Sequence, residues 1–387
     1  MRNILFVLDR DFTSNSAVHV SALANELCLR GLDCAIAVPR KKESVGECGT
    51  IHFRPLTFNE TADWSNAFAD GRGPDAVHCW TPREIVRKFC VALRSRGDFK
   101  LFIHLEDNEE LLTEKLLAGA PPADEFPDQL AHPTRYREFL QTADGVTVII
   151  DRLREFVPPG VPHLTLWPGV DTTLFAPPAD RVELKRRYGI PLDCTVIVYA
   201  GNVHRANAAE VRSLYLAVAL LNRSGVPTLL VRTGENHFEL PGAAQNDSLT
   251  HFLPAGGVWM QPYLRHMGFV PRARMPEVLA LADVFVQPGR ADRFNEYRFP
   301  SKLPEFLALG RPLILPASNL GHVLRHEQDA LVLEQADAIR ITEAVQRLSR
   351  EPQLTARLAA NARAFAETRL SWPRQAARLF EFYQQSG

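Results

Sequence analysis

Residues 298–314 bring together a basic side chain, an expected helix start and a carboxylate. Lys302 stands beside that helix start, where free backbone N–H groups attract anions. Ser301 is expected to cap the helix and Leu303 to begin its buried stripe. Glu305 follows one turn in, and an ionised carboxylate accepts hydrogen bonds from hydroxyl groups well. The stretch therefore predicts a site that binds phosphates and a ribose diol together.

The elements that must position these residues form two series. Apolar runs of strand length alternate with helical patterns along the chain. The first series of predicted strands is Ile4–Leu8, Cys34–Val38, Ala76–Cys79, Leu101–His104, Val146–Ile150 and Leu164–Leu166. The second series is Val196–Ala200, Thr228–Val231, Met267–Val270, Val284–Val286, Leu313–Leu315 and Ala330–Leu333. Strands separated by helices indicate parallel β-α-β units, so the predicted fold class is α/β with two Rossmann-like, doubly wound domains facing each other across a cleft.

A Pro/Gly-rich break at residues 167–178 separates the two series. We therefore expect an N-terminal domain at 1–178 and a C-terminal domain at 179–369. Residues 108–132 form a long insertion with an apolar-acidic helix followed by a Pro-rich segment, and either a mobile flap or a solvated insertion fits it.

Composition and charge narrow the function classes. The chain has 387 residues, 46% hydrophobic and 23% charged, as in ordinary soluble proteins. A formal net charge of -1 gives no support to a nucleic-acid partner. The six cysteines form no CxxC pair, which favours buried thiols in a reducing compartment. We expect no membrane span and no signal peptide, and hence a cytoplasmic protein.

The basic side chains around Arg83, Arg87 and Lys88 are interpreted as solvated helix faces. Because these side chains are basic, peripheral attachment of the protein to a membrane surface remains an alternative. No Asp-x-Asp motif is present, and two cations can replace a metal ion electrostatically, so we expect no metal and no cofactor.

Several motifs, in this order along the chain, resemble those of the family 4 retaining glycosyltransferases, which have the two-domain GT-B fold. They are Asp144–Val148, Trp167–Phe175, Gly268–Val270 with Met275–Val284, Pro300–Glu305 with Gly310–Pro312, and the terminal helix 372–384. The resemblance covers nearly the whole chain. It implies that the C-terminal domain binds a nucleotide-sugar, that the N-terminal domain binds an acceptor, and that the helix within 370–387 packs back on the N-terminal domain.

The resemblance also implies roles in binding the donor. Glu305 matches the second carboxylate of a Glu-x7-Glu motif, which binds the ribose hydroxyls. The first carboxylate is missing, because Tyr297 stands eight residues before Glu305, and Glu296 is the nearest substitute. The loop after the strand Val196–Ala200 matches the donor-diphosphate loop. Its predicted contacts are Gly201, Asn202 and Arg205, and Ser301, Lys302 and Leu303 at the helix start are predicted to contact the donor as well. Arg205 and Lys302 are the candidates to neutralise the charge of the leaving diphosphate.

In the N-terminal domain, the resemblance implies that His104 ends a strand and bonds the transferred sugar. The alternative for His104 is a core histidine whose hydrogen bonds are satisfied within the protein. The first strand-to-helix loop lacks the family's Gly pair, so side chains of this loop and of the helix after it are expected to contact the acceptor or a phosphate. They are Ser14, Asn15, Ser16 and His19. Glu106 and Asp107, which follow the strand of His104, are further candidates for acceptor contacts.

The expected activity is transfer of a sugar, with retention of configuration, from a nucleotide-sugar to a glycan, a lipid-linked or a small-molecule acceptor. A GT-B nucleotide-sugar epimerase and a catalytically inactive sugar-nucleotide binder remain alternatives, and the missing carboxylate at Tyr297 motivates the second. A dinucleotide oxidoreductase is disfavoured, because no GxGxxG follows the strand Ile4–Leu8. The base and sugar of the donor, the acceptor and the oligomeric state are left open.

Overall fold

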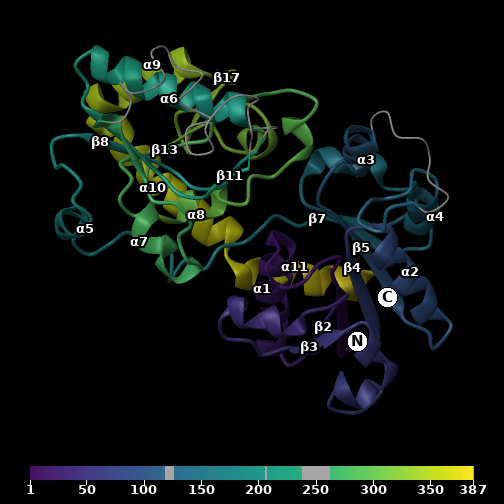
Figure 1. Cartoon of the computed structure of the whole chain (residues 1–387). Helices are drawn as coiled ribbons and strands as arrows, with labels where there is room; N and C mark the ends of the chain where they lie inside the picture. The colour runs from purple at the N-terminus through teal and green to yellow at the C-terminus, as the bar shows by residue number, and fades with distance from the viewer. Residues whose placement is uncertain (118–125, 205–206, 238–261, 387) are drawn as a thin grey trace. The chain divides into compact units, whose positions relative to one another are not determined.

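The computed structural model describes residues 1–117, 126–204, 207–237 and 262–386, which group into two compact units (Figure 1). Unit 1 comprises Met1–Gly169, Tyr297–Ser301 and Leu370–Gly387, and unit 2 comprises Val170–Glu296 and Lys302–Arg369. By this grouping residues 170–178, assigned above to the N-terminal domain, belong to unit 2.

Unit 1 contains a seven-stranded sheet in the order β3-β2-β1-β4-β5-β6-β7, with parallel pairing throughout. Its strands are β1 (Asn3–Val7), β2 (Asp33–Val38), β3 (Arg54–Thr57), β4 (Ala76–Trp80), β5 (Lys100–Leu105), β6 (Gly145–Val148) and β7 (His163–Thr165). The six strands predicted for this half are confirmed. β3 was not predicted, because Arg54 and Pro55 interrupt the apolar pattern, which an edge strand tolerates.

Helices and short helical turns cover this sheet. They are α1 (Asn15–Leu29), α2 (Glu84–Arg94), α3 (Glu109–Leu117), α4 (Arg135–Gln141), α11 (Trp372–Gln385) and the turns η1 (Lys42–Cys48), η2 (Asn59–Ala62), η3 (Trp64–Asn66) and η4 (Asp151–Phe156). α3 confirms the helix predicted at the start of the long insertion, whose Pro-rich segment lies largely outside the described residues.

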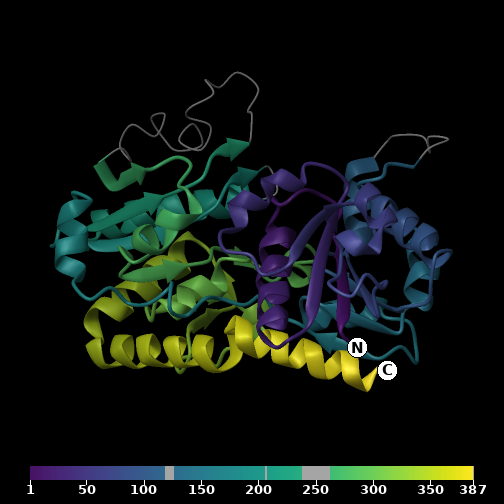
Figure 2. The same cartoon turned by 90° about the horizontal axis from the view of Figure 1, so that it is seen from below.

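The C-terminal helix α11 belongs to the core of unit 1. It packs along α1, as Figure 2 shows with α11 in yellow and α1 in purple. Phe382 and Tyr383 are buried in the same apolar cluster as Phe102 of β5. Gly145 is needed for this packing, since a Cβ there would lie 2.7 Å from the Phe382 ring.

Unit 2 contains a six-stranded parallel sheet in the order β12-β10-β8-β13-β15-β16. Its strands are β8 (Thr195–Tyr199), β10 (Thr228–Arg232), β12 (Leu264–His266), β13 (Val284–Val286), β15 (Leu313–Pro316) and β16 (Leu331–Leu333). Five of the predicted strands are confirmed, but the strand predicted at Met267–Val270 is wrong. β12 ends at His266, because Gly268 takes a left-handed φ of 62° and Pro271 has no N–H to pair.

Helices and short strand pairs complete unit 2. The helices are α5 (Arg181–Arg187), α6 (Ala208–Arg223), α7 (Met275–Leu279), α8 (Leu303–Ala308), α9 (Ala338–Arg350) and α10 (Pro352–Phe365), and the short strands are β9 (Val203–His204), β11 (Asn236–His237), β14 (Gly289–Arg290) and β17 (Gln335–Ala336). The short helical turns are η7 (Arg272–Arg274), η8 (Asn295–Tyr297), η9 (Asn319–His322) and η10 (Ala366–Leu370). Of these turns, η8 and η10 each contain residues of both units. No helix in the described part of the chain is both long and apolar enough to cross a membrane. All six cysteines are free thiols.

Both sheets have the strand order 3-2-1-4-5-6 when their strands are numbered along the chain, with β7 added at the edge of unit 1. This is the Rossmann order, which confirms the two predicted Rossmann-like domains. The order reverses between β1 and β4 in unit 1 and between β8 and β13 in unit 2. In such sheets ligands bind at the carboxyl ends of the strands beside the reversal, so a ligand site is expected at each of these two edges.

Candidate functional site

In unit 2 the loop that follows β8 begins with a glycine in a conformation that other residues rarely adopt. Gly201 has a φ of 128°, a conformation that favours glycine. Gly234 packs directly on it, since a Cβ at Gly234 would lie 2.6 Å from the carbonyl oxygen of Gly201. The side chain of Asn202 accepts a hydrogen bond of 2.8 Å from the backbone N–H of Glu235. Asn202 therefore fixes the loop, and the backbone of Gly201 is exposed to a ligand.

Lys302 lies on this same loop. Its Nζ donates to the carbonyl oxygen of Ala200 at 3.2 Å and lies 3.8 Å from the centre of the Tyr199 ring. A cation over an aromatic face is stabilised by the ring quadrupole. The structure thus brings Lys302 together with Ala200 and Gly201, at the carboxyl end of β8. Arg205, the other predicted cation of this loop, lies outside the described residues.

The start of α8 differs from the prediction. The helix begins at Leu303, its N-cap is Lys302 and no side chain caps it. Ser301 is exposed and groups with unit 1, so the predicted cap is wrong because the helix starts one residue later than a Ser301 cap requires. Leu303, a predicted donor contact, is fully buried.

Glu305 lies in the first turn of α8 with its side chain 16% exposed. Its carboxylate is 3.8 Å from the guanidinium of Arg272, in the turn η7. Burial raises the pKa of Glu305 to about 7, although Arg272 lowers it. A buried carboxyl group with an unusually high pKa is typical of a binding site, because a ligand that donates hydrogen bonds would stabilise its ionised form.

Glu296 lies in η8, within a loop tied to the rest of unit 2. Its carboxylate is 2.9 Å from Nε2 of His322. Asp292 accepts from the backbone N–H of Asn295 at 2.8 Å, and Asn295 Nδ2 donates to Glu210 of α6 at 2.6 Å. The loop that carries Glu296 is therefore fixed, and the side chain is 24% exposed.

Tyr297, where the family motif has its first carboxylate, groups with unit 1. Its hydroxyl donates a hydrogen bond to the carboxylate of Glu155. The guanidinium of Arg152 lies 5.5 Å from the centre of the Tyr297 ring. Tyr297 is therefore engaged in packing and hydrogen bonding within unit 1.

His104 is completely buried at the carboxyl end of β5. Its ring stacks on Trp80 with 3.8 Å between the ring centres. Nδ1 lies 2.7 Å from the hydroxyl of Thr147, whereas Nε2 is buried with no hydrogen-bond partner among the described residues. Burial lowers the pKa of His104 to about 3, so the imidazole is neutral at ordinary pH.

Glu106 holds together the loop beside His104. Its carboxylate accepts from Trp80 Nε1 at 2.7 Å and from the Ser16 hydroxyl at 2.5 Å, and it lies 3.6 Å from Nδ1 of His19. Burial raises the pKa of Glu106, but the contacts from His19 and Ser16 outweigh burial and lower it to about 2. Glu106 is therefore ionised at neutral pH and holds Trp80 and Ser16 by charge-assisted hydrogen bonds.

Two other predicted residues of the first loop lie at the start of α1. Ser14 is the N-cap, and its hydroxyl accepts from the backbone N–H of Ala17 at 3.2 Å. Asn15, the first residue of the helix, is exposed. The hydroxyl of Ser14 thus stabilises the helix, as caps of this type do.

A second charged cluster surrounds Arg83. Its guanidinium lies 2.7 Å from Asp9, 3.4 Å from Glu109 and 3.7 Å from Asp107. Burial raises the pKa of Asp107 and raises that of Glu109 to about 7, although Arg83 lowers both. The interpretation of Arg83 as part of a solvated face is wrong, because its side chain is only 12% exposed and Asp9 attracts it inward.

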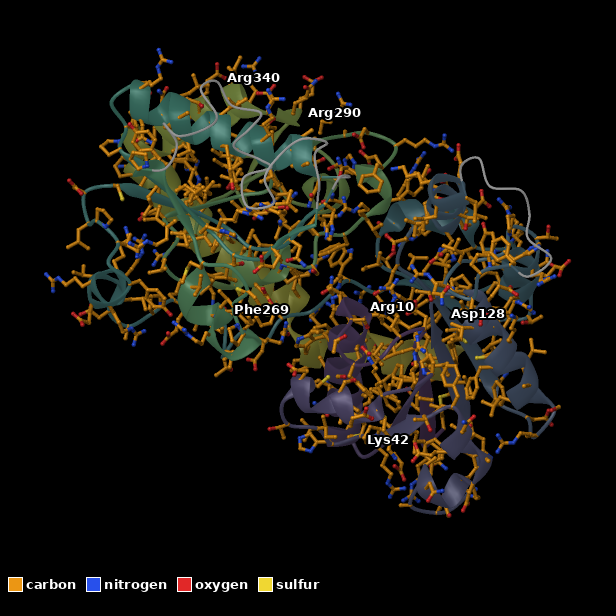
Figure 3. The ribbon with its side chains drawn as sticks, in the orientation of Figure 1. Arg10, Lys42, Asp128, Phe269, Arg290 and Arg340 are labelled. Atoms are coloured by element: carbon orange, nitrogen blue, oxygen red, sulfur yellow. The ribbon has the colours of Figure 1, made fainter. Side chains whose placement is uncertain are left out.

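Several residues of these two edges were not predicted as site residues. Arg272, His322 and Trp80 contact predicted residues but come from distant parts of the chain, and no local motif marks them. Thr147, which contacts His104, was quoted only as part of the motif Asp144–Val148, and Asp9 contacts Arg83. Phe269 was quoted only as part of a motif, yet its side chain is 76% exposed, on the surface of unit 2 (Figure 3). Among the described residues no three His, Cys, Asp or Glu side chains are placed to hold a metal ion.

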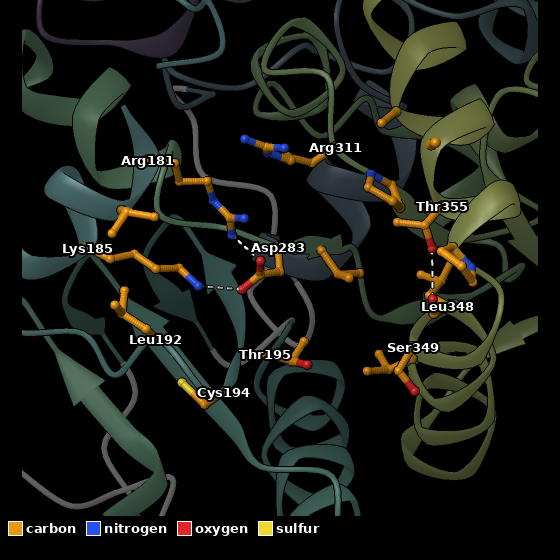
Figure 4. Close-up of a pocket in the computed structure, with 17 residues that line it drawn as sticks. Arg181, Lys185, Leu192, Cys194, Thr195, Asp283, Arg311, Leu348, Ser349 and Thr355 are labelled. Carbon is orange, nitrogen blue, oxygen red and sulfur yellow. Dashed lines mark hydrogen bonds and ion pairs between the residues drawn. The ribbon is translucent and has the colours of Figure 1, made fainter. Parts of the chain in front are cut away.

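A cavity on the described part of unit 2 lies away from the predicted residues. It has a volume of about 550 Å³ and is lined where β8 and β13 begin, by Thr195 and Val284 among others (Figure 4). Asp283 at its wall is 2.9 Å from Lys185 Nζ and accepts from the backbone N–H of Val196 at 2.8 Å. These contacts attach α5 to the sheet. We therefore interpret the charged groups at this cavity as stabilising the fold and not as binding a ligand.

Comparison with known proteins bears on both units. Residues 194–351 match the profile of the family described as Glycosyl transferases group 1. Over 225 residues the chain is 27% identical to the D-inositol 3-phosphate glycosyltransferase of Xylanimonas cellulosilytica, covering 57% of this chain and 50% of the relative. The chain thus spans about half the length of the curated relatives it matches first.

Solved structures resemble the whole chain. Sucrose-phosphate synthase from Thermosynechococcus elongatus has a TM-score of 0.71 at 18% identity, covering 100% of this chain and 99% of that one. Anabaena HepE in complex with UDP-glucose has a TM-score of 0.70 at 14% identity, covering 100% of both chains. Likenesses at this level of identity establish the fold, which is that of the GT-B glycosyltransferases.

Proposed function

Because the chain carries a Glycosyl transferases group 1 domain, we propose that it transfers a sugar from a nucleotide-sugar bound by unit 2 to an acceptor bound by unit 1. The observation that carries the proposal is that Lys302 Nζ lies at the carbonyl of Ala200, next to Gly201, at the carboxyl end of β8. A backbone loop with a cation beside it suits a diphosphate.

The ribose is assigned to Glu305. As a carboxylate it accepts from both hydroxyl groups of a ribose diol, and its burial makes these hydrogen bonds strong. Arg272 sits close enough to stabilise the ionised form. Glu305 and Lys302 belong to the same unit and to the same turn of chain, so a nucleoside diphosphate binds across both.

We propose that the reaction retains the configuration of the sugar. In that mechanism the acceptor hydroxyl attacks the face from which the nucleotide leaves, and the leaving phosphate accepts the proton. The protein then has to orient the reactants and stabilise developing charge. His104 and Glu296 are the candidates for contacts with the transferred sugar. No metal or cofactor is included in this proposal, since Lys302 supplies positive charge at the diphosphate.

The acceptor is assigned to the cluster of Arg83, Asp9, Asp107 and Glu109 at the carboxyl ends of β1, β4 and β5. The side chain of Asp107 is 35% exposed and is suited to hydroxyl donors of a glycan, a lipid-linked glycan or a small polyol, while the buried Asp9 and Glu109 hold Arg83 beside it. Among the relatives, the D-inositol 3-phosphate glycosyltransferases support a hydroxyl-rich acceptor, and HepE makes UDP-glucose the first donor to test.

An assay that needs no acceptor tests this proposal. The full chain is incubated with UDP-, GDP-, ADP- and dTDP-glucose, and the released sugar is followed by proton NMR from the first minutes. Slow transfer to water with one donor, giving α-glucose first, supports a retaining transferase. An altered sugar configuration at another carbon indicates the epimerase, and tight binding without turnover of any donor or added acceptor indicates the inactive binder.

A further inference from the structure

A buried chain of hydrogen bonds ends at His104. The hydroxyl of Tyr383 lies 2.6 Å from Nδ1 of His78, and Nε2 of His78 lies 3.0 Å from the hydroxyl of Thr147. The same hydroxyl lies 2.7 Å from Nδ1 of His104. All four side chains are fully buried, and they come from α11, β4, β6 and β5 of unit 1.

The hydrogens in this chain have one arrangement that satisfies the most groups. The hydroxyl hydrogen of Tyr383 needs an acceptor, and within the described residues His78 Nδ1 is its sole partner. His78 then carries its hydrogen on Nε2 and donates to Thr147. The Thr147 hydroxyl donates in turn to Nδ1 of His104, which leaves the hydrogen of His104 on Nε2.

The reverse arrangement of the hydrogens leaves one more buried polar group without a hydrogen-bond partner. If Nδ1 of His104 carried the hydrogen, Thr147 would donate to His78, and Nδ1 of His78 would donate to Tyr383. The Tyr383 hydroxyl hydrogen would then be buried without an acceptor, in addition to the unpartnered Nε2 of His104. Each arrangement leaves one donor without an acceptor, which is Nε2 of His104 in the first and the Tyr383 hydroxyl in the second. Only the second also leaves a buried acceptor, Nε2 of His104, without a donor.

We propose that Tyr383, on the C-terminal helix, is a positioning residue that acts through His78 and Thr147 to hold His104 in the tautomer with hydrogen on Nε2. The unpartnered Nε2 of His104 is thereby a neutral hydrogen-bond donor, reserved for an oxygen atom of a ligand. His104 consequently donates to that oxygen and does not remove a proton from it.

The surrounding groups keep this arrangement neutral. Burial lowers the pKa of His78 far below its ordinary value and that of His104 to about 3, and burial raises the pKa of Tyr383. The charged or titratable groups that face the chain are Glu106 and His19 at His104 and Cys34 at Tyr383. Stacking on Trp80 holds the plane of the His104 ring, so the donor direction is fixed as well.

The consequence for catalysis rests on the proposed function, whereas the tautomer itself does not. If unit 1 contacts the transferred sugar through His104, loss of the Tyr383 hydroxyl lowers kcat by roughly tenfold, the effect of one hydrogen bond to a reacting molecule. The KM for the nucleotide-sugar changes less than kcat, because the folded core and the contacts with the diphosphate are unchanged.

Nitrogen NMR of the full chain with ¹⁵N-labelled histidine tests the proposal without substrate. The His104→Gln variant identifies the two signals of His104. We expect Nε2 to be protonated and Nδ1 to be unprotonated in the parent between pH 6 and 8. In Tyr383→Phe and Thr147→Val the preference is lost and both tautomers become populated, whereas Thr147→Ser, which keeps a hydroxyl, restores the parent spectrum.

The control is Tyr136→Phe, which removes a hydroxyl bonded to Glu110 elsewhere in unit 1 and should leave the His104 signals unchanged. A protonated Nδ1 in the parent overturns the proposal, and so do parent-like signals in both Tyr383→Phe and Thr147→Val. If the tautomer is confirmed but no nucleotide-sugar reacts, the proposed function fails and the positioning role stands.

Discussion

The ammonium group of Lys302 lies 3.2 Å from the carbonyl oxygen of Ala200, the residue that follows β8, the first strand of the unit 2 sheet. This contact joins the start of α8 to the loop of Gly201, at the edge where a Rossmann-like sheet binds its ligand. It places a positive charge beside exposed backbone, and the predictions about the donor follow from it.

Lys302→Met is expected to weaken binding of a nucleoside diphosphate roughly 10- to 100-fold, because one charge-assisted hydrogen bond to phosphate is lost. The methionine keeps the apolar stem over Tyr199. Titration calorimetry measures the effect. Arg340→Met, on the exposed face of α9 in the same unit, removes an equal charge and should leave affinity within twofold (Figure 3). Equal affinities for the parent and Lys302→Met would remove Lys302 from the site.

Glu305→Gln should weaken binding of the same nucleoside diphosphate roughly tenfold or more, because an amide oxygen is a poorer acceptor than a carboxylate. A 2′-deoxyribose nucleotide should lose affinity for the parent but lose less for Glu305→Gln. Glu277→Gln, an exposed residue of the neighbouring α7, is the matched control. If deoxyribose and ribose nucleotides bind the parent equally well, Glu305 does not bind the ribose.

Nucleotide affinity should rise with pH through the pKa of Glu305, which burial raises to about 7. Below that pH the carboxyl group is protonated, and binding must release the proton, at a cost of about tenfold in affinity per pH unit. Titrations between pH 5.5 and 8 in the parent should show this slope, and Glu305→Gln should flatten it.

The same raised pKa has the opposite effect on folding. The unfolded chain has an ordinary pKa of 4.5 at this residue, so between pH 4.5 and about 7 the folded state binds more protons. The contribution of Glu305 to the free energy of unfolding therefore falls as pH rises through this window. Urea unfolding of Glu305→Gln should lack this contribution, and an unchanged pH profile would contradict it.

Glu106 should stabilise unit 1 at neutral pH. Its pKa is lowered from 4.5 to about 2, and this shift is equivalent to about 3 kcal/mol of stability that is present above pH 4.5 and is lost as pH falls towards 2. Urea unfolding should show Glu106→Gln less stable than the parent by an amount of that order at pH 7, with the difference shrinking below pH 4.5. Glu47→Gln, at an exposed position, is the control. If the stability difference between Glu106→Gln and the parent does not depend on pH, the variant has lost packing contacts and not the stabilisation of an ionised carboxylate.

The regular part of the fold could be predicted from sequence because buried parallel strands are continuous apolar runs. β1 and β8 show this pattern clearly. β3 does not, since it lies at the edge of its sheet and includes Arg54 and Pro55. The position of β12 also could not be read from the pattern, because the apolar residues after it continue past the turn at Gly268.

The site was predictable where its residues lie close together in sequence. Lys302 and Glu305 stand within one turn, and their spacing marks the start of a helix. Their partners Ala200 and Arg272 are distant in sequence and come near only through the order of the strands. The chain from Tyr383 to His104 joins four elements, and no local pattern indicates it.

A thermal-shift panel of UDP, GDP, ADP and dTDP with the full chain tests the central claim, that unit 2 binds a nucleotide-sugar through Lys302 and Glu305. A ligand present at 100 times its Kd stabilises the folded state by about 2.7 kcal/mol, which shifts the melting temperature measurably. We predict that one of the four nucleotides raises the melting temperature of the parent and of Glu277→Gln, and that this shift is smaller in Lys302→Met and Glu305→Gln. No shift with any of the four, or equal shifts in all four proteins, would contradict it.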